Sequence, residues 1–243
     1  MNILIPKTIH YIWLGGKPMH PLMVQWRQEW ESLHPGWEVK IWSEIPGRPA
    51  SLTSWHETLD SSFPELLRDS CHLSQKSNIW RYELLHRLGG LYLDTDFEPL
   101  KCIEPLIVGL KAFAGKCHVA NSPNMTIGCG GMFGCVSRDP WTKDLIENMP
   151  SRDPGISMSL GASYFNEITS RHPEVHLFEP DVFYSQRCEQ PGHYKSPIPT
   201  AAYAVHRWSS KWFPDGFKPL TTEKPCPSPI SSIPQQAQDR IDG

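Results

Sequence analysis

The sequence predicts an α/β protein in which helices flank a mixed, mostly parallel sheet. Strand, helix and strand follow one another over residues 7–41, which is the βαβ order of a parallel sheet. A second helix runs through a Gly-Gly turn into another strand over residues 72–93. The 24 prolines among 243 residues are about twice the usual share and exclude an all-helical bundle.

The first βαβ unit begins with residues 7–14, a nearly continuous apolar run that is typical of a strand buried on both faces. Pro21 then opens a helix whose apolar residues recur every three or four positions until Pro35 ends it. Polar and apolar residues alternate over 38–41, which predicts the second strand. Turn-forming residues over 44–64 predict a loop-rich insert before the next helix.

The next unit contains the most regular helical pattern of the chain, from His72 to Leu88. The predicted apolar face of this helix consists of Leu73, Ser77, Trp80, Leu84 and Leu88. Gly89 and Gly90 occupy the position of a helix C-cap, and the strand over 91–93 leads directly into Asp94-Thr95-Asp96.

The remaining elements have weaker patterns. We predict a strand over 130–136, helices over 141–148 and 157–170, and strands over 175–178 and 203–206. From Pro214 onward the chain has little apolar content. The sequence therefore predicts one domain over residues 1–213 and a proline-rich, partly disordered tail over 214–243.

Composition and charge exclude several functions. A formal net charge of −3 and a pI of about 6.4 leave no basic field to drive nucleic-acid or membrane binding by itself. No stretch reaches the roughly 18 apolar residues of a transmembrane segment, and no secretory signal pattern is found. The 7 cysteines are odd in number and include no Cys-x-x-Cys pair, which predicts reduced thiols in a cytoplasmic protein. A thiolate zinc site has no spacing to support it.

Asp94 and Asp96 stand two residues apart at the end of the strand over 91–93. If the strand conformation continues, both carboxylates point to one face, beyond the carboxyl end of the sheet where ligands of such folds bind. Two like charges this close repel each other unless a cation lies beside them, and Mg²⁺ or Mn²⁺ is the natural partner of oxygen ligands. The alternative is a solvated turn after a strand.

Asn78 and Arg81 lie three residues apart in the preceding helix and share a face that is distinct from the apolar one. The Gly-Gly turn can bring this face near Asp94, where Arg81 would offer positive charge and hydrogen bonds to an oxygen-rich ligand. The alternative is a surface arginine that is solvated or paired with Glu83 or Asp69.

A third cluster spans residues 204–212. His206 follows a short apolar strand and could add an imidazole ligand to the metal, although a structural histidine fits the pattern equally well. Arg207 and Lys211 could balance phosphate charge, and Trp212 could stack in or cover a pocket.

Three blocks, in order along the chain, resemble one known family. They read I-P-K-T-I-H-Y-I-W-L-G-G near the start, S-N-I-W-R-Y-E-L-L-H-R-L-G-G-L-Y-L-D-T-D-F in the middle and H-R-W-S-S-K-W near the end. These blocks are similar to those of DXD-containing glycosyltransferases of family 32. The resemblance implies a GT-A-type Rossmann-like fold, a nucleotide-sugar donor with UDP favoured, a divalent Mn²⁺ or Mg²⁺ ion and retention of anomeric configuration.

The resemblance also implies roles by position. Arg81, Asp94 and Asp96 would be catalytic, and Asp94, Asp96 and His206 would bind the metal. The substrate-binding positions would be Ile12, Trp13, Asn78, Arg81, Tyr92, Asp94, Ser210 and Trp212. Among them Trp13 would stack on the nucleobase, although its place at the end of a strand also allows ordinary core packing.

One position departs from the family pattern. Members usually have Ser-Asp-x-x-Arg, whereas this chain has Asn78 in place of the aspartate, and an amide lacks the negative charge. A catalytically silent nucleotide-sugar or glycan binding module is therefore the alternative function. A metal-dependent phosphohydrolase is a third reading, for which Glu98 is the only further carboxylate nearby. The sequence does not distinguish among a glycan, a lipid-linked sugar, a protein and a modified nucleobase as the acceptor. It also does not indicate the oligomeric state.

Overall fold

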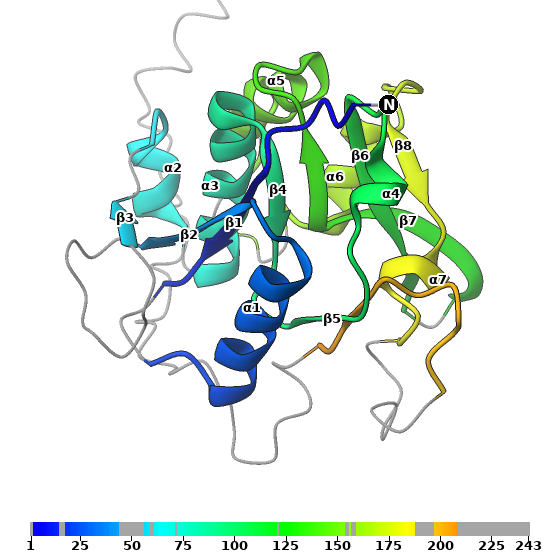
Figure 1. The fold of residues 1–243 in the computed structure, drawn as a ribbon. Coiled ribbons are helices and arrows are strands. Elements are labelled where there is room, and N and C mark those ends of the chain that lie inside the picture. The colour runs from blue at the N-terminus through cyan, green and yellow to red at the C-terminus, as the bar shows by residue number, and fades with distance from the viewer. Residues whose placement is uncertain are drawn as a thin grey trace, which may run out of the picture.

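The centre of the molecule is a seven-stranded sheet with a separate two-stranded ribbon beside it (Figure 1). The computed structural model describes residues 2–14, 18–43, 56–58, 61–70, 72–120, 122–153, 156, 159–187 and 197–208. The predicted tail over 214–243 lies outside the described residues, as do Ser210, Lys211 and Trp212. The predicted domain boundary therefore stays a prediction.

Strands and helices alternate along the first half of the chain. The large sheet contains β1 (Thr8–Ile12), β2 (Glu38–Ser43), β3 (His56–Thr58), β4 (Gly90–Leu93), β6 (Ala112–Val119), β7 (Ser122–Cys135) and β8 (His176–Phe178). The ribbon pairs β5 (Phe97–Pro99) with β9 (Ala204–His206). The helices are α1 (Pro21–Leu33), α2 (Pro64–Asp69), α3 (Leu73–Leu88), α4 (Glu104–Ile107), α5 (Pro140–Glu147), α6 (Ala162–Thr169) and α7 (Pro180–Phe183).

Six of the seven described strands of the large sheet run in one direction. The order is β3-β2-β1-β4-β7-β6-β8, in which β2 pairs in parallel with β1 and β3, β1 with β4, and β6 with β8. Strand β7 runs antiparallel to both of its neighbours, β4 and β6. This mixed, mostly parallel sheet with flanking helices confirms the fold class predicted from the sequence. Because β1 and β4 are parallel neighbours, their carboxyl ends meet at one edge of the sheet.

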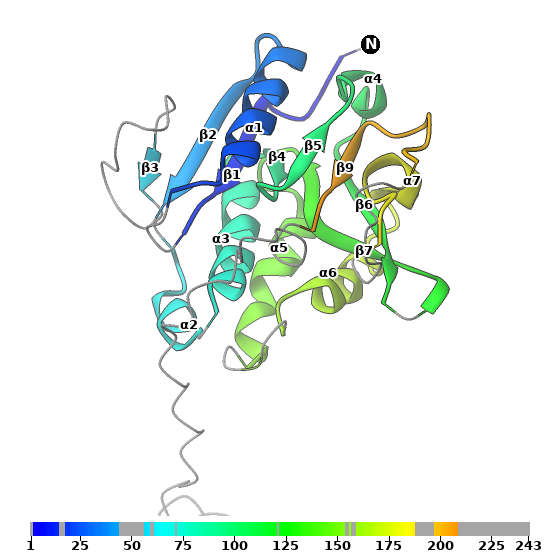
Figure 2. The ribbon, with the colours of Figure 1, turned by 90° about the horizontal axis from the view of Figure 1, so that it is seen from below.

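The alternation of side chains along β4 separates two hydrophobic cores. Leu91 and Leu93 face a core that they share with Trp30 of α1 and with Phe97, whereas Tyr92 faces the core beneath α3, α5 and α6. Figure 2 shows α1 and the β5–β9 ribbon on one side of the sheet and α3, α5 and α6 on the other. The end of β4 therefore lies between these two layers.

The turn from α3 into β4 depends on two glycines. Gly89 and Gly90 have φ angles of +66° and +99°, a region that residues with a side chain rarely adopt. A Cβ atom at Gly89 would lie 2.6 Å from the Ser137 nitrogen, and one at Gly90 would lie 2.7 Å from the Thr8 carbonyl oxygen. The predicted C-cap at Gly89 is confirmed, and the close packing that it permits places α3 directly against the strand that leads to Asp94.

The burial of α3 differs from the prediction. Leu73 and Leu88, at the two ends of the predicted apolar face, are 39% and 40% exposed. Between these two ends, the polar residues Gln75, Asn78 and Arg81 are buried. The physical reason is that the sheet covers one side of α3 while α5 and the turn before α6 cover another, so that polar positions are enclosed as well.

Other differences concern the extent of elements. The strand predicted over 130–136 is the last part of the longer β7, and the patterns do not predict β3, β5, β6, α2, α4 or α7. Strand β3 lies within the loop-rich insert predicted over 44–64, most of which is outside the described residues. The helix predicted over 157–170 begins only at Ala162, because turns formed by hydrogen bonds from Ile156 to Asp153 and from Ser159 to Ile156 precede it. Four described cysteines are free thiols, as predicted: Cys102, Cys117, Cys129 and Cys135.

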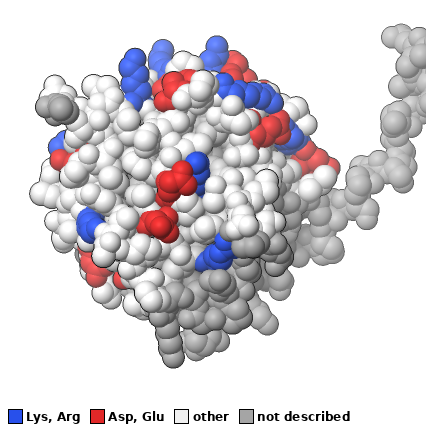
Figure 3. Space-filling model, turned by 90° about the vertical axis from the view of Figure 1, so that its right-hand side faces the viewer, with Lys and Arg blue, Asp and Glu red and all other residues white. Residues whose placement is uncertain are grey.

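Among the described residues, no helix is both long and apolar enough to cross a bilayer. On the face shown in Figure 3, acidic and basic side chains are interspersed among uncharged ones, and both kinds gather along the upper edge. The described part of this face therefore offers no broad basic surface, in agreement with the slightly acidic composition.

Candidate active site and metal centre

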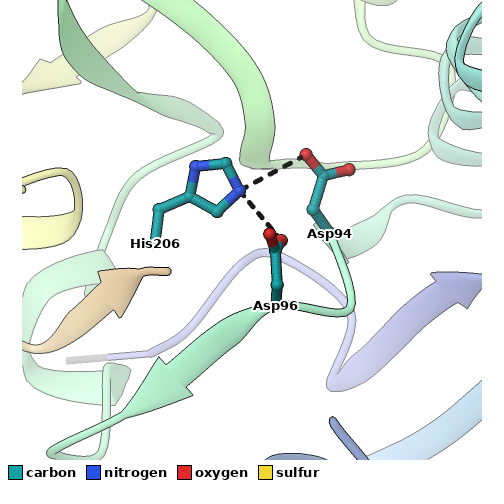
Figure 4. Close-up of side chains that lie close together, drawn as sticks. All are labelled: Asp94, Asp96 and His206. Carbon is teal, nitrogen blue, oxygen red and sulfur yellow. Dashed lines mark hydrogen bonds and ion pairs between the residues drawn. The ribbon is translucent and has the colours of Figure 1, made fainter. Parts of the chain in front are cut away.

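Three side chains that can ligate a metal converge beyond the carboxyl end of β4. Asp94 follows β4, Asp96 precedes β5 and His206 ends β9. The His206 Nε2 atom lies 2.9 Å from Asp96 Oδ1 and 3.9 Å from Asp94 Oδ2 (Figure 4). One ligand atom from each residue lies within 4.8 Å of the other two. Within the part of the chain that the structure describes, this is the one such cluster of histidine, cysteine and carboxylate groups.

A turn brings the two carboxylates together. The strand ends before Asp94, and the Phe97 amide donates to the Asp94 carbonyl at 3.3 Å. The Asp94 amide donates to the Gly131 carbonyl at 2.8 Å, and the Arg207 amide donates to the Asp96 carbonyl at 2.9 Å. The turn is therefore fixed to β7 on one side and to the end of β9 on the other. The predicted convergence is found, but the expectation that a continuing strand causes it is wrong.

Aromatic rings hold His206 in place. Its ring stacks on Phe97 with centroids 4.5 Å apart, and the Trp208 ring centroid lies 4.1 Å away. The side chain is buried, which alone would lower the pKa of His206, but the charge of Asp96 and, secondarily, that of Asp94 raise this pKa. Nδ1 makes no hydrogen bond within the described residues, so that the polar contacts of the ring are concentrated at Nε2. Trp208 was not among the residues that the sequence singles out.

Asp94 is held from the opposite side by α3 and β4. The Tyr92 hydroxyl donates to Asp94 Oδ1 at 2.8 Å, and a guanidinium nitrogen of Arg81 lies 3.3 Å from the same oxygen. The guanidinium also lies over the Tyr92 ring, 4.6 Å from its centroid, and donates to the Gly130 carbonyl at 2.7 Å. With Oδ1 engaged in this way, Asp94 directs Oδ2 toward His206 (Figure 4).

Arg81 is a buried cation. Only 8% of the residue is exposed, and it donates to the hydroxyl and the carbonyl of Ser77 at 3.3 and 3.4 Å. Burial alone would lower the pKa of Arg81, but the neighbouring Asp94 carboxylate raises it, so the guanidinium stays charged. The prediction that this helix face lies near Asp94 is confirmed. The alternative of a surface arginine paired with Glu83 or Asp69 is wrong.

Strand β7 supplies contacts that sequence reasoning did not identify. A Cβ atom at Gly131 would lie 2.7 Å from Asp94 Oδ2, so the carboxylate occupies space that only glycine leaves free. Cys129 is buried two residues earlier, and a hydrogen bond with Cys117 of β6 is the largest of the causes that lower the pKa of Cys129 to about 6. The glycine-rich sequence of β7 is the feature of the sequence that could have indicated these close contacts.

The donor set fits a divalent ion. Two carboxylates supply hard oxygen ligands, and an imidazole supplies a nitrogen ligand that Mn²⁺ accepts more readily than Mg²⁺ does. Arg81 offsets the charge of Asp94, and a protonated His206 offsets that of Asp96. A bound divalent cation would replace the His206 proton as the second source of positive charge beside the carboxylates.

Two predicted substrate-binding residues lie at the carboxyl end of β1. Ile12 is buried in the core on the α3 side, whereas Trp13 is half-buried and packs against a small cluster that includes Met23 of α1. The Thr95 hydroxyl contacts the Met23 sulfur at 3.6 Å, so this cluster adjoins the turn that carries Asp94 and Asp96. Stacking of Trp13 on a nucleobase stays a prediction.

The predicted role of Arg207 is corrected by its contacts. Its guanidinium is buried, lies 2.5 Å from Glu98 Oε2 and donates to Gln186 Oε1 at 3.1 Å. The expectation that Arg207 balances phosphate charge is wrong, because its charge is paired inside the protein. The ion pair with Arg207 also occupies Glu98, which is the third carboxylate that a two-metal hydrolase would need.

Comparison with known proteins finds a family match in the segment that carries the Asp94–Asp96 turn. The family model described as "Glycosyltransferase sugar-binding region containing DXD motif" matches residues 22–111, which include α3, β4 and the Asp94–Asp96 turn. This match confirms, over residues 22–111, the resemblance to DXD-containing glycosyltransferases that the sequence predicts.

One curated relative and two solved structures are similar to the chain. Inositol phosphoceramide mannosyltransferase 3 of Schizosaccharomyces pombe is 28% identical over 148 residues, which is 60% of this chain and 37% of that protein. The PaToxG glycosyltransferase aligns over 70% of each chain with 17% identity and a TM-score of 0.49. The ligand-free glycosyltransferase domain of the YGT toxin aligns over 72% of this chain and 80% of that one, with 9% identity and a TM-score of 0.49. At these TM-scores the two structures carry no argument about the site.

Proposed function

We propose that this chain is a metal-dependent glycosyltransferase that moves a sugar from a nucleotide-sugar donor, with UDP-sugars favoured, to an acceptor. The bond between the anomeric carbon and the diphosphate breaks, a bond from that carbon to an acceptor nucleophile forms on the same face, and the nucleophile's proton is released. The observation that carries the proposal is the convergence of Asp94, Asp96 and His206, because two of these residues lie in the segment that matches the DXD family.

Each residue of the cluster has a role in this proposal. Asp94 and Asp96 would hold Mn²⁺ or Mg²⁺ through carboxylate oxygens, and His206 would hold it through Nε2. The bound ion would supply a Lewis acid that neutralises the charge of the leaving nucleoside diphosphate. Arg81 keeps Asp94 in place and adds a fixed positive charge beside it.

The donor contacts are proposed from family position. Trp13 would stack on the nucleobase, Asn78 would bind a hydroxyl of the donor sugar, and Ser210 and Trp212 would reach the diphosphate. What supports Trp13 is its position at the carboxyl end of β1, beside the cluster that touches the Asp94–Asp96 turn. What supports Asn78 is its position one helical turn before Arg81.

An activity screen tests the proposal. The protein is incubated with UDP-glucose, UDP-galactose, UDP-N-acetylglucosamine or GDP-mannose and Mn²⁺, and release of the nucleoside diphosphate is measured with and without added acceptors. We expect metal-dependent release with at least one donor, and a loss of about 100-fold in Asp96→Ala, because the ion supplies several kcal/mol of charge stabilisation. Asp69→Ala, an exposed carboxylate on α2, is the matched control. Unchanged turnover in Asp96→Ala would remove the proposed role of the cluster.

A catalytically silent binding module is the second candidate. The observation that favours it is Asn78, which lacks the charge of the family aspartate and donates its amide to Gln75 at 3.2 Å. Calorimetry with UDP and Mn²⁺, combined with the activity screen, separates the two candidates. Tight binding without hydrolysis or transfer to any acceptor would favour the module. Release of sugar 1-phosphate or free phosphate would instead revive a phosphohydrolase.

A further inference from the structure

Gln75 makes a complete set of hydrogen bonds inside the protein. Its side chain lies on α3, one turn before Asn78, and the residue is fully buried. Nε2 donates to the Ile156 carbonyl at 3.0 Å and to the Ser159 hydroxyl at 2.7 Å. Oε1 accepts from the Leu160 amide at 3.4 Å and from Asn78 Nδ2 at 3.2 Å. These four contacts use both hydrogens and both acceptor sites of the amide.

The orientation of the Gln75 amide follows from partners that can play only one role. The Ile156 carbonyl can only accept a hydrogen bond, and the Leu160 amide can only donate one. The Ser159 hydroxyl donates its single hydrogen to the Asp153 carbonyl at 2.6 Å, so it accepts from Gln75. A reversed amide would place oxygen against two acceptors and NH₂ against a donor in a buried position, which is costly.

The orientation of Gln75 fixes that of Asn78 in turn. Because Gln75 presents an oxygen, Asn78 must present its Nδ2 group, and its own carbonyl oxygen remains for another partner. Among the described residues, Asn78 makes one side-chain hydrogen bond, which is the bond to Gln75. Only 5% of Asn78 is exposed. Arg81, one turn further along the helix by about 4.5 Å, contacts Asp94. The side-chain carbonyl oxygen of Asn78 is therefore a fixed acceptor one helical turn from the arginine that contacts Asp94.

We propose that Gln75 is a positioning residue for donor selection: it holds Asn78 so that the Asn78 carbonyl accepts a hydrogen bond from a hydroxyl of the donor sugar. This inference rests on the proposed glycosyltransferase function. This positioning explains how the chain would bind the donor sugar with an amide at Asn78, because the amide carbonyl is a hydrogen-bond acceptor without a charge. It also implies that Asn78→Asp is disfavoured here, because a second acceptor would lie about as close to the Gln75 oxygen as the present donor, 3.2 Å away.

A double-mutant cycle tests the orientation without any ligand. Denaturation midpoints are compared for the wild type, Asn78→Asp, Gln75→Ala and the double variant, with Gln75→Met, which keeps the side-chain volume, replacing Gln75→Ala if that variant does not fold. We expect the midpoint loss caused by Asn78→Asp to be at least halved when Gln75 is absent, because the opposing oxygen is gone. Equal losses in both backgrounds would overturn the proposed orientation.

Calorimetry in the presence of Mn²⁺ tests the role in donor binding. The probes are UDP-glucose, UDP-galactose and GDP-mannose, each compared with UDP or GDP alone. Gln75→Met should weaken the nucleotide sugar about fivefold more than the nucleoside diphosphate, which is the effect of one hydrogen bond. Gln28→Met, an exposed position on α1, is the matched control. Equal weakening of both ligands, or none, would overturn the positioning role. If the wild type binds no nucleotide sugar, both the proposed function and the positioning role are wrong. The double-mutant cycle still shows how the Asn78 amide is oriented.

Discussion

Asp94 and Asp96 lie two residues apart in the chain but are held in place in different ways. Asp94 contacts Arg81 and Tyr92, which belong to the same helix–turn–strand unit. Asp96 contacts His206, which lies 110 residues further along the chain. The partner of Asp94 is a permanent cation, whereas the partner of Asp96 is a base that can release its proton and bind a metal.

Because of this difference, the two sides of the site respond differently to pH and to a metal ion. Asp94 has a neutralising charge beside it that does not depend on a metal, because Arg81 stays protonated. Under the proposed function, a proton and a metal ion would compete for the same atoms of Asp96 and His206. The following variants are designed to weaken one side of the site at a time.

The largest effect is expected when Arg81 is changed. Arg81→Lys keeps a positive charge, but a lysine cannot contact the Gly130 carbonyl and Asp94 Oδ1 together in the way the guanidinium does. We expect a loss of about 2 kcal/mol in the free energy of unfolding and about 100-fold in transfer activity. Chemical denaturation and donor turnover measure the two effects. Arg87→Lys, an exposed arginine of the same helix, is the control, and similar behaviour of the two variants would contradict the positioning of Asp94 by Arg81.

The pH dependence of metal binding probes the Asp96 side. The pKa of His206 is raised, so in the metal-free protein its charge stabilises the fold below the unfolded value near 6.5, and this contribution is lost as pH rises through the folded pKa. A metal must displace that proton, so Mn²⁺ affinity should rise up to about tenfold per pH unit below the folded pKa. Calorimetry between pH 6 and 8 measures the slope. His206→Asn should flatten it, and an equal slope in both proteins would exclude His206 as the source.

Gly131→Ala tests the space around Asp94. The new Cβ would lie 2.7 Å from Asp94 Oδ2 and would force the carboxylate away from His206. We expect about a tenfold loss of Mn²⁺ affinity and a loss of stability of about 1–3 kcal/mol from overpacking. Gly128→Ala is the matched control, because its Cβ would meet nothing closer than 3.7 Å. Metal affinity that is equal in the two variants would show that Asp94 tolerates the displacement.

The smallest effect on activity is expected at Glu98. Glu98→Gln keeps a hydrogen-bond acceptor for buried Arg207 but removes its charge partner, so the free energy of unfolding should fall by about 1–2 kcal/mol. Transfer activity should stay within about twofold, since Glu98 is engaged by Arg207 and not by the cluster. A steep loss of turnover with unchanged stability would instead point to a second metal ligand, as in a phosphohydrolase.

The Asp94 side could be predicted from the sequence because its parts are consecutive. A regular helix, a Gly-Gly turn and a short apolar strand leave few ways to arrange Arg81 and Asp94 other than side by side. His206 is different, because an isolated histidine after a short strand has many structural roles, and the pattern alone does not distinguish a metal ligand from a structural histidine. The pairing of β5 with β9, which joins distant segments, is what brings it to Asp96.

Gln75 shows why the rest of the site could not be predicted. In the helical pattern it occupies a polar position, which usually faces solvent. It is buried because it contacts Ile156 and Leu160, which lie 81 and 85 residues further along the chain. Strand β6 escapes prediction for a related reason: Gly115 and Lys116 interrupt its apolar residues, and its stability comes from pairing with β7 and β8.

The most direct test of the central claim is a titration of the purified protein with Mn²⁺, followed by calorimetry or by the loss of the free-ion electron paramagnetic resonance signal. The structure predicts one Mn²⁺ per chain at the Asp94–Asp96–His206 cluster, and a loss of affinity of about 100-fold in Asp96→Asn but none in Asp69→Asn. Unchanged binding in Asp96→Asn, or no saturable binding in the wild type, would contradict the account.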